Sequence, residues 1–212
     1  MAAVEDLVQS VIEGNVDRVK DLSRSLLDAG KDPLEIINQG LIAGMNVVGA
    51  RFKAMEMFVP EVLMCAKAMS QGVEVVKPHI ADQQVHAAGK FMIGTVKSDL
   101  HDIGKNLVAM MVESSGFEVI NLGIDIAPDK FVEAIKEHKP DVVGLSALLT
   151  NTLPFMKDTI DAIEEAGLRD QVKVIIGGAP VTQEYADQIG ADGYAPEAAS
   201  ATDLCKELLS VS

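Results

Sequence analysis

Residues 91–123 read FMIGTVKSDLHDIGKNLVAMMVESSGFEVINLG, and this stretch decides the fold. Two short apolar runs, FMIGTV (91–96) and FEVINLG (117–123), flank the amphipathic pattern GKNLVAMMVESSG (104–116). A continuous apolar run of this length, bounded by turn residues, is typical of a strand that is buried on both faces. A strand, a helix and a second strand form the repeating unit of a parallel sheet. The stretch therefore predicts a βαβ unit.

The same alternation continues to the end of the chain. Three further apolar runs are DVVGLSAL (141–148), VKVIIGG (172–178) and DGYA (192–195). Helical patterns stand between and after them: DKFVEAIKEHK (129–139), LPFMKDTIDAIEEAG (153–167), VTQEYADQIG (181–190) and ATDLCKELLS (201–210). Residues 90–212 are thus predicted to be an α/β domain with a doubly wound, five-stranded parallel sheet in flavodoxin-like order. Such sheets bind ligands beyond the carboxyl ends of their strands.

Residues 1–85 have a different pattern, with apolar positions at spacings of three and four residues throughout. Turn residues interrupt it near 14–15, 30–33 and 58–60, so we expect a domain of four helices packed as a bundle. The last helix should bury one stripe of side chains, formed by Val59, Val62, Leu63, Ala66, Met69, Val73 and Val76. The polar, alanine-rich stretch KPHIADQQVHAAG (77–89) suits a linker to the second domain.

Composition excludes several classes of function. The net charge is −14, from 32 acidic and 18 basic residues, and no cluster of lysine and arginine offers a surface for nucleic acid. Cys65 and Cys205 stand outside any zinc or disulfide spacing, and we interpret both as reduced core thiols. The sequence shows neither a leader peptide nor an apolar run of membrane-spanning length. It predicts a cytoplasmic protein that binds neither nucleic acid nor membrane.

The loop after the first strand contains Asp99-x-His101-x-x-Gly104. A histidine there can present one ring nitrogen to a metal, while a nearby carboxylate such as Asp99 accepts a hydrogen bond from the other nitrogen. A lone histidine could instead cap a helix or pack in a polar loop, and a hydrolytic metal site built from His101, Asp99 and Asp102 remains open. A phosphate-binding loop is excluded because Gly94 is too far from Gly104 and no Ser or Thr follows Lys105.

The third and fourth strands end in small and hydroxyl-bearing residues, GLSALLTNT (144–152) and IGGAP (176–180). Small residues let a bulky group approach the backbone, and hydroxyl groups supply polar anchors along its path. The set predicts a long slot between the strand ends, although Gly177-Gly178 alone could be an ordinary tight turn.

Taken in order along an α/β domain, Asp99-x-His101-x-x-Gly104, Ser146-x-Leu148 and Gly177-Gly178 resemble a known cobalamin-binding domain. Methionine synthase and the corrinoid proteins of methanogenic and acetogenic methyltransferases share that domain. The resemblance implies that the cofactor's own base leaves the cobalt and that His101 takes its place as the lower ligand. It also implies the expected cofactor, a cobalamin such as methylcobalamin or another corrinoid, with cobalt as its metal.

The resemblance also assigns roles to other residues. Asp99 would be the hydrogen-bond partner of His101, and Thr152 would complete that relay. The remaining residues expected to bind the cofactor are Leu100, Asp102 and Gly104 in the loop, and Ser146, Leu148, Thr150, Gly177, Gly178 and Ala198 along the slot for the nucleotide tail. One departure from the family is Ser98, because the residue before this aspartate is commonly glycine.

The helical half extends the resemblance. GMNVVGARF (44–52) followed by MFVPEV (57–62) is similar to the cap that covers the upper face of the corrin. By position, Phe52, Val59 and Val62 would contact the methyl side of the cofactor, whereas apolar periodicity alone would make them bundle core. A cap must swing aside to admit partner proteins, which makes residues 77–89 the expected hinge.

The function implied is that of a methyl carrier in one-carbon metabolism. A substrate-specific methyltransferase would place a methyl group on the cobalt, and a second methyltransferase would pass it to a folate or thiol acceptor. A reductive activation protein is a further expected partner. The sequence contains no nucleophile–base pair, so it predicts a methyl-carrier subunit of a corrinoid-dependent methyltransferase system and leaves open whether the isolated chain is an enzyme.

Two other classes use the same domain. A cobalamin-dependent regulator or light sensor would normally add a DNA-binding module and a bulky aromatic residue over the cofactor, but this chain has no tryptophan and no basic patch. The cobalamin domain of a mutase usually lacks the cap. The methyl donor is not encoded in any recognisable motif, so methanol, methylamines, betaines and methoxylated aromatics all stay open.

Overall fold

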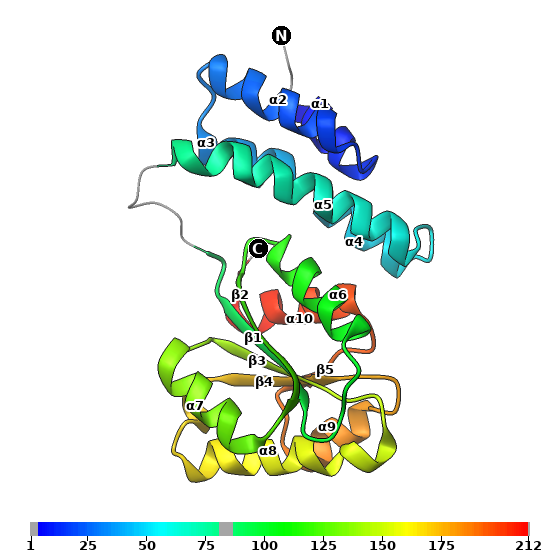
Figure 1. The fold of residues 1–212 in the computed structure, drawn as a ribbon, viewed down its shortest axis with the longest axis vertical. Coiled ribbons are helices and arrows are strands. Elements are labelled where there is room, and N and C mark those ends of the chain that lie inside the picture. Colours follow the sequence, from blue (N-terminus) through cyan, green and yellow to red (C-terminus); the bar gives the residue numbers. More distant parts are fainter. Residues whose placement is uncertain (1–3, 81–86, 212) are drawn as a thin grey trace. The chain divides into compact units, whose positions relative to one another are not determined.

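The computed structural model describes residues 4–80 and 87–211. These residues form two compact units that divide next to Ala87. The first is all helical, and the second is an α/β unit built on a parallel sheet. Figure 1 shows the elements of each unit.

The helical unit contains four helical segments in chain order. They are α1 (Val4–Ile12), α2 (Val16–Asp28), a continuous segment made of α3 (Pro33–Glu35), the π-helical η1 (Ile36–Ile42) and α4 (Ala43–Lys53), and finally α5 (Val59–Val76). Side chains cap three of the starts: Asn15 accepts from the backbone N–H of Arg18, Asp32 from that of Leu34, and Glu61 from that of Phe58. The four helices predicted for this half of the chain are present.

Glycines allow close packing between these helices. A Cβ added to Gly44 would lie 2.7 Å from Cβ of Val11, and one added to Gly72 would lie 2.7 Å from a methyl group of Leu41. The backbones of α1, α4 and α5 therefore approach their neighbours more closely than any larger residue would allow.

The buried face of α5 differs from the predicted stripe. The residues that α5 buries are Val62, Cys65, Ala66, Ala68, Met69, Gly72 and Val76. Val59 and Leu63 were predicted to be in the bundle core, but they are 37% and 44% exposed. The prediction was wrong at these two positions because small residues, Ala68 and Gly72, form part of the contact and shift the buried face around the helix.

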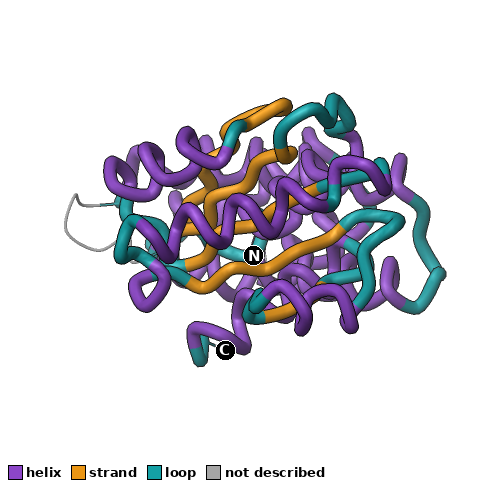
Figure 2. Tube along the Cα trace, turned by 90° about the horizontal axis from the view of Figure 1, so that it is seen from below, coloured by secondary structure: helices purple, strands orange, loops and turns teal. Residues whose placement is uncertain are grey.

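The sheet contains five parallel strands in the order β2-β1-β3-β4-β5, which confirms the predicted flavodoxin-like arrangement. The strands are β1 (Lys90–Val96), β2 (Glu118–Ile126), β3 (Val142–Ser146), β4 (Lys173–Gly177) and β5 (Gly193–Tyr194). The helices that alternate with them are α6 (Ile103–Glu113), α7 (Pro128–His138), α8 (Pro154–Glu165), α9 (Gln183–Ile189) and α10 (Ala198–Leu209). Figure 2 shows strands of the sheet running side by side. β2 extends three residues beyond its predicted end.

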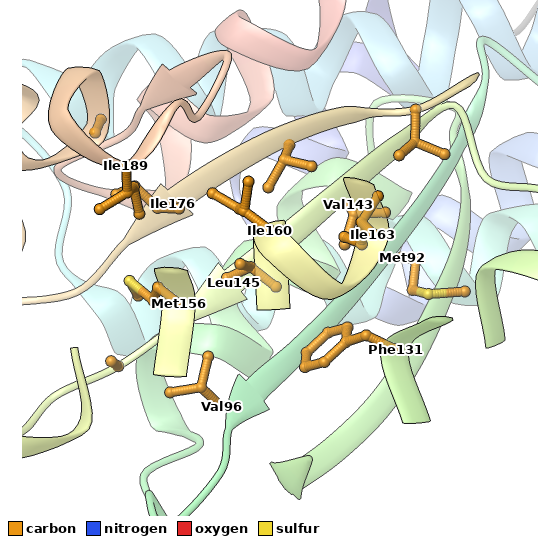
Figure 3. Packing of buried hydrophobic residues seen from close by; sticks show 14 of the residues in the cluster. Met92, Val96, Phe131, Val143, Leu145, Met156, Ile160, Ile163, Ile176 and Ile189 are labelled. Atoms are coloured by element: carbon orange, nitrogen blue, oxygen red, sulfur yellow. The ribbon is translucent and has the colours of Figure 1, made fainter. Parts of the chain in front are cut away.

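Helices cover both faces of this sheet. On one face, Met92, Val143 and Ile176 pack against side chains of α7, α8 and α9, among them Phe131 and Ile160 (Figure 3). On the other face, Phe91, Val142 and Ile175 pack against α6 and α10. Neighbouring residues of one strand thus belong to different cores, as the period of two along a strand requires. Burial on both faces explains why the inner strands β1, β3 and β4 are nearly continuous apolar runs in the sequence.

Short 3₁₀ turns complete the chain: η2 (Lys77–His79), η3 (Thr150–Thr152) and η4 (Arg169–Gln171). η2 occupies the start of the predicted linker and hinge at 77–89, whose residues 81–86 lie outside the described part of the chain. Cys65 and Cys205 are free, buried thiols, and burial raises the pKa of Cys205 to about 12. None of the helices described at 4–80 and 87–211 combines the length and the apolar character needed to cross a bilayer.

Candidate functional site

The loop that joins β1 to α6 carries the predicted histidine at the carboxyl edge of the sheet. Asp99 in this loop is fully buried. Its Oδ1 lies 2.7 Å from Nδ1 of His101 and accepts the backbone N–H of His101 at 3.1 Å. The hydroxyl of Thr95, on β1, donates to the carbonyl of His101 at 2.8 Å. The Asp99–His101 contact predicted from the sequence is therefore present, and the backbone of the histidine is held from two sides.

The second oxygen of Asp99 is equally occupied. Its Oδ2 accepts the backbone N–H groups of Leu148 and Leu149 at 2.8 and 3.2 Å. It also accepts the hydroxyl of buried Thr152 at 2.8 Å. Asp99 thus ties the loop after β1 to the segment after β3, and Thr152 stands in the relay position that the resemblance implies.

These bonds set the ionisation of Asp99. Burial alone would raise the pKa of this carboxyl, but the hydrogen bonds from Leu148, His101 and Thr152 outweigh it and hold the pKa well below its usual range. A carboxylate that is charged at neutral pH and lies at Nδ1 keeps a ring proton on that nitrogen. In the neutral ring the lone pair is then on Nε2, and the side chain is 49% exposed.

Ser98 stands where related domains commonly have glycine, and its backbone conformation shows why glycine is common there. Its φ is +64°, in the left-handed region where glycine is favoured. The backbone conformation that the loop needs is thus kept in this chain with a side chain that is strained there.

We expect Ser98→Gly to raise the free energy of unfolding by about 0.5 kcal/mol, because relief of a left-handed penalty of about 1–2 kcal/mol exceeds the extra chain entropy that glycine gains on unfolding, about 0.5–1 kcal/mol. Urea unfolding measures the change. Ser98→Ala is the control, since alanine keeps the penalty and should leave stability nearly unchanged. A Ser98→Gly protein that is less stable than the alanine variant would contradict the account.

A buried lysine supports the start of α6. Lys105 donates to the side-chain oxygens of Asn106 and Asn121, each at 2.6 Å. Burial lowers the pKa of Lys105, and the nearby carboxylate of Asp102 partly offsets that effect. Asn106 in turn donates to Asp102 at 3.0 Å, so the network reaches back to the residue after His101.

Exposed apolar residues stand next to His101 in the sequence and in the segment that Asp99 ties to its loop. Leu100 and Ile103, on either side of His101, are 66% and 81% exposed, and Leu148 and Leu149 are also exposed. A Cβ added to Gly104 would meet no atom within 4 Å, so no protein contact accounts for a glycine there. Large apolar residues left in water beside a polar ligand atom indicate a surface that binds something flat and largely apolar.

The residues predicted to line a slot lie at the ends of neighbouring strands. Ser146 at the end of β3 pairs in register with Gly177 at the end of β4. Gly178 has φ +135°, and a Cβ there would lie 1.8 Å from the carbonyl oxygen of Ala147. Thr150 is exposed in η3, and Ala198 is the buried first residue of α10. Gly178 is therefore required by the protein's own backbone.

The three predicted residues of the helical unit lie in different environments. Val62 is fully buried among the helices, Phe52 is partly buried, and Val59 is exposed. Exposed apolar side chains do gather in the sequence from the middle of α4 to the start of α5. They are Val47, Met55, Phe58, Val59, Leu63 and Met64.

Sequence reasoning missed part of this arrangement. It did not find Asp125, whose Oδ1 accepts the backbone N–H of Ser98 at 2.7 Å, or the partners of Lys105. The signal for Asp125 is its place just after the predicted end of the second strand at Gly123, but the spacing of apolar residues does not show that it faces the histidine loop. The hydrolytic metal site is not formed, since no three His, Cys, Asp or Glu side chains converge anywhere in the described chain.

Comparison with known proteins agrees with this site. Residues 89–203 and residues 3–77 each match a family model described as a B12 binding domain. Dimethylamine corrinoid protein 1 of Methanosarcina acetivorans is 46% identical over 97% of this chain and 98% of its own length.

Two solved structures are also similar. One is a cobalamin-binding protein from Desulfitobacterium hafniense, with a TM-score of 0.83 and 32% identity over 98% of this chain and 99% of that one. The other is the methanol:cobalamin methyltransferase complex of Methanosarcina barkeri, with a TM-score of 0.88 and 29% identity over 99% of this chain and 80% of that one. The chain therefore belongs to the family of corrinoid proteins of methyltransferase systems, with two B12 binding domains and cobalamin as the cofactor.

Proposed function

We propose that this protein carries a methyl group on the cobalt of a bound corrinoid, taking it from a substrate-specific methyltransferase and giving it to a second methyltransferase. The observation that carries the proposal is His101, with its Nδ1 held by the buried carboxylate of Asp99 and its Nε2 free on a half-exposed ring. A neutral imidazole nitrogen of this kind is a good axial ligand for a transition metal.

The residues around His101 fit a corrin. The group is broad, flat and largely apolar, and the exposed side chains of Leu100, Ile103, Leu148 and Leu149 offer it an apolar surface. The open space at Gly104 leaves room for it close to the helix start. When bound, the cobalamin supplies the cobalt that accepts and releases the methyl group, while the protein supplies binding and orientation.

In this proposal the chain's own groups have separate tasks. His101 would hold the lower face of the cobalt, and Asp99 would keep the proton on Nδ1 so that Nε2 remains a ligand. Asp102 and Gly104 would contact the cofactor beside them. The nucleotide tail would lie along the strand ends, against Ser146, Thr150, Gly177 and Gly178 and towards Ala198, which is supported by the register pairing of Ser146 with Gly177.

The helical unit would cover the other face of the cofactor. Support comes from the apolar side chains that it leaves exposed between Val47 and Met64. Phe52 and Val59 would contact the methyl side directly, and Val62, which is buried, would act through the packing of α5. A change between covered and open states would need a hinge, for which residues 77–89 are the proposed segment.

The partners are proposed from the relatives. One relative is named for dimethylamine and one similar structure is a complex with a methanol methyltransferase, so related chains are described with different methyl donors. The donor of this chain would accordingly be set by its partner. We further propose an acceptor methyltransferase that uses a folate or a thiol, a reductive activation protein, and a cytoplasmic setting, which the two free thiols support.

Isotope transfer tests the proposal. The purified protein is reconstituted with methylcobalamin labelled in its methyl group, and unbound cofactor is removed. Without a second enzyme, we expect the label to stay on the cofactor bound to the protein. When an acceptor methyltransferase is added, the label should move to the thiol or folate. In the donor direction, the protein is loaded with hydroxocobalamin, reduced, and mixed with a donor methyltransferase. It should then gain a methyl group from either dimethylamine or methanol. Failure to retain any cobalamin would overturn the proposal.

A further inference from the structure

The second strand is irregular where it passes the histidine loop. Ile93 of β1 pairs with Asn121, but Gly94 pairs with Gly123 and Val96 with Ile126. The register therefore shifts by one residue twice within a few residues. Gly123 has φ +91° and Asp125 has φ +54°, so both shifts coincide with left-handed backbone. Such bulges bend a strand and redirect its side chains, and they recur beside functional sites.

The second shift brings Asp125 against the loop that carries His101. Oδ1 of Asp125 accepts the backbone N–H of Ser98 at 2.7 Å, and its own N–H donates to the carbonyl of Asp99 at 3.0 Å. Asp125 therefore holds Asp99, the partner of His101, and Ser98, the residue before it. One of them, Ser98, is itself in the left-handed region, with φ +64°. A strained residue of this kind persists only where its surroundings fix it.

The first shift gives a second anchor at the other end of the loop. Oδ1 of Asn121 accepts the backbone N–H of Gly123 at 3.0 Å and the ammonium of Lys105 at 2.6 Å. Lys105 and Asn106 lie in the first turn of α6, and Asn106 bonds to Asp102. The loop between β1 and α6 is thus attached to β2 on both sides of His101.

We propose that Asp125 is a positioning residue for the lower ligand: by fixing Ser98 and Asp99, it holds His101 where Nε2 can reach the cobalt. The inference rests on the proposed function, because it assumes that His101 is that ligand. Asp125 makes no bond to the imidazole itself. Its effect would therefore show in the equilibrium between ligated and unligated cofactor, and cofactor retention would change little.

The test is the visible spectrum of bound methylcobalamin, which distinguishes cobalt with a lower nitrogen ligand from cobalt without one. Asp125→Ala removes the acceptor for Ser98. Loss of one hydrogen bond to a charged group should lower the ratio of ligated to unligated cofactor roughly tenfold. Asp125→Asn keeps an acceptor oxygen and tolerates a left-handed backbone, so it should retain the spectrum of the unmodified protein.

Asp141 provides a matched control at the opposite end of β1. Its Oδ2 accepts the backbone N–H of Lys90 at 2.7 Å, and its own N–H donates to the carbonyl of Lys90 at 2.9 Å. Asp141→Ala therefore removes the same kind of bond far along the strand from the loop. It should lower stability to a similar degree and leave cobalt ligation unchanged.

The outcomes separate the two proposals. An Asp125→Ala protein with the unmodified spectrum, or an Asp141→Ala protein with an equal spectral change, would overturn the role of Asp125. If Asp125→Ala does not fold, Asp125→Gly takes its place, since glycine adopts the same φ without strain and also lacks the acceptor. Failure of the proposed function would show differently, as unmodified protein whose bound cobalamin has no lower nitrogen ligand.

Discussion

Replacing His101 with alanine is expected to leave cobalamin bound while removing the lower nitrogen ligand from the cobalt. The imidazole is half exposed and its ring is hydrogen-bonded to Asp99, so its loss deletes little buried surface. Retention of the cofactor should then rest on the apolar side chains around the loop and on the strand ends. The visible spectrum of methylcobalamin bound to His101→Ala should change completely to that of the form without a lower nitrogen.

Rescue by free imidazole and a control substitution at a second histidine would show that the spectral change is specific to His101. Free imidazole added to the His101→Ala protein should restore nitrogen ligation, because the space vacated by the side chain can hold it. His138→Ala is the control, since His138 lies at the exposed end of α7. The assignment of His101 as the ligand fails if the alanine variant keeps the unmodified spectrum before imidazole is added.

The sequence predicted the fold closely because the α/β unit follows one simple rule. Strands covered on both faces, such as β3 with Val142 and Val143 in different cores, must be apolar at every position. That requirement makes β1, β3 and β4 almost uninterrupted apolar runs, whereas the edge strand β2 also contains Glu118, Asn121 and Asp125. The turn residues between the runs then mark the helix boundaries, and the strand order follows from the doubly wound architecture.

The relay at the site was also predictable. The loop motif itself indicated the Asp99–His101 pair, whereas Thr152 was assigned from the resemblance to cobalamin-binding domains; hydrogen bonds join all three. Asp125 was not predictable from periodicity. Its position depends on two register shifts in β2, and left-handed conformations at non-glycine residues such as Ser98 leave no pattern in the sequence.

The face of α5 was misassigned for a related reason. Apolar spacing predicted that Val59 and Leu63 point into the bundle, whereas the structure buries Ala68 and Gly72 and exposes those two larger side chains. A helix with apolar residues on more than one side offers several stripes, and hydrophobicity does not choose among them. The lack of a side chain at Gly72 decided it here, since side-chain methyl groups of Leu41 and Val19 pack directly against that glycine. The larger side chains, Val59 and Leu63, are therefore exposed on the surface of the helical unit.

Asp99→Asn is expected to lower the free energy of unfolding by about 2–4 kcal/mol near neutral pH, because the amide cannot accept all the hydrogen bonds that reach the carboxylate. Those donors are His101 on Oδ1, and Leu148, Leu149 and Thr152 on Oδ2. If the amide turns its NH₂ towards Leu148, buried N–H groups face one another. If it turns the NH₂ towards His101, Nδ1 becomes the acceptor and Nε2 must carry the proton, which removes the ligand lone pair.

The pH dependence of this loss follows from the depressed pKa of Asp99. In the unfolded chain the carboxyl titrates near pH 3.9, and in the folded protein it titrates well below that. A group with a lowered folded pKa adds stability that is complete above its unfolded pKa and that disappears as the pH falls towards the folded pKa. The stability difference between the unmodified protein and Asp99→Asn should therefore be constant above about pH 5 and shrink below about pH 4.

Urea unfolding at a series of pH values measures that difference, and Asp141→Asn serves as the control. Asp141 accepts one backbone N–H in an exposed setting, so its variant should lose less stability than Asp99→Asn. A difference for Asp99→Asn that stays constant down to pH 3 would mean that the carboxylate is not selectively stabilised in the folded protein. The lone pair of His101 would then depend on something other than the charge of Asp99, and the relay would lose its physical basis.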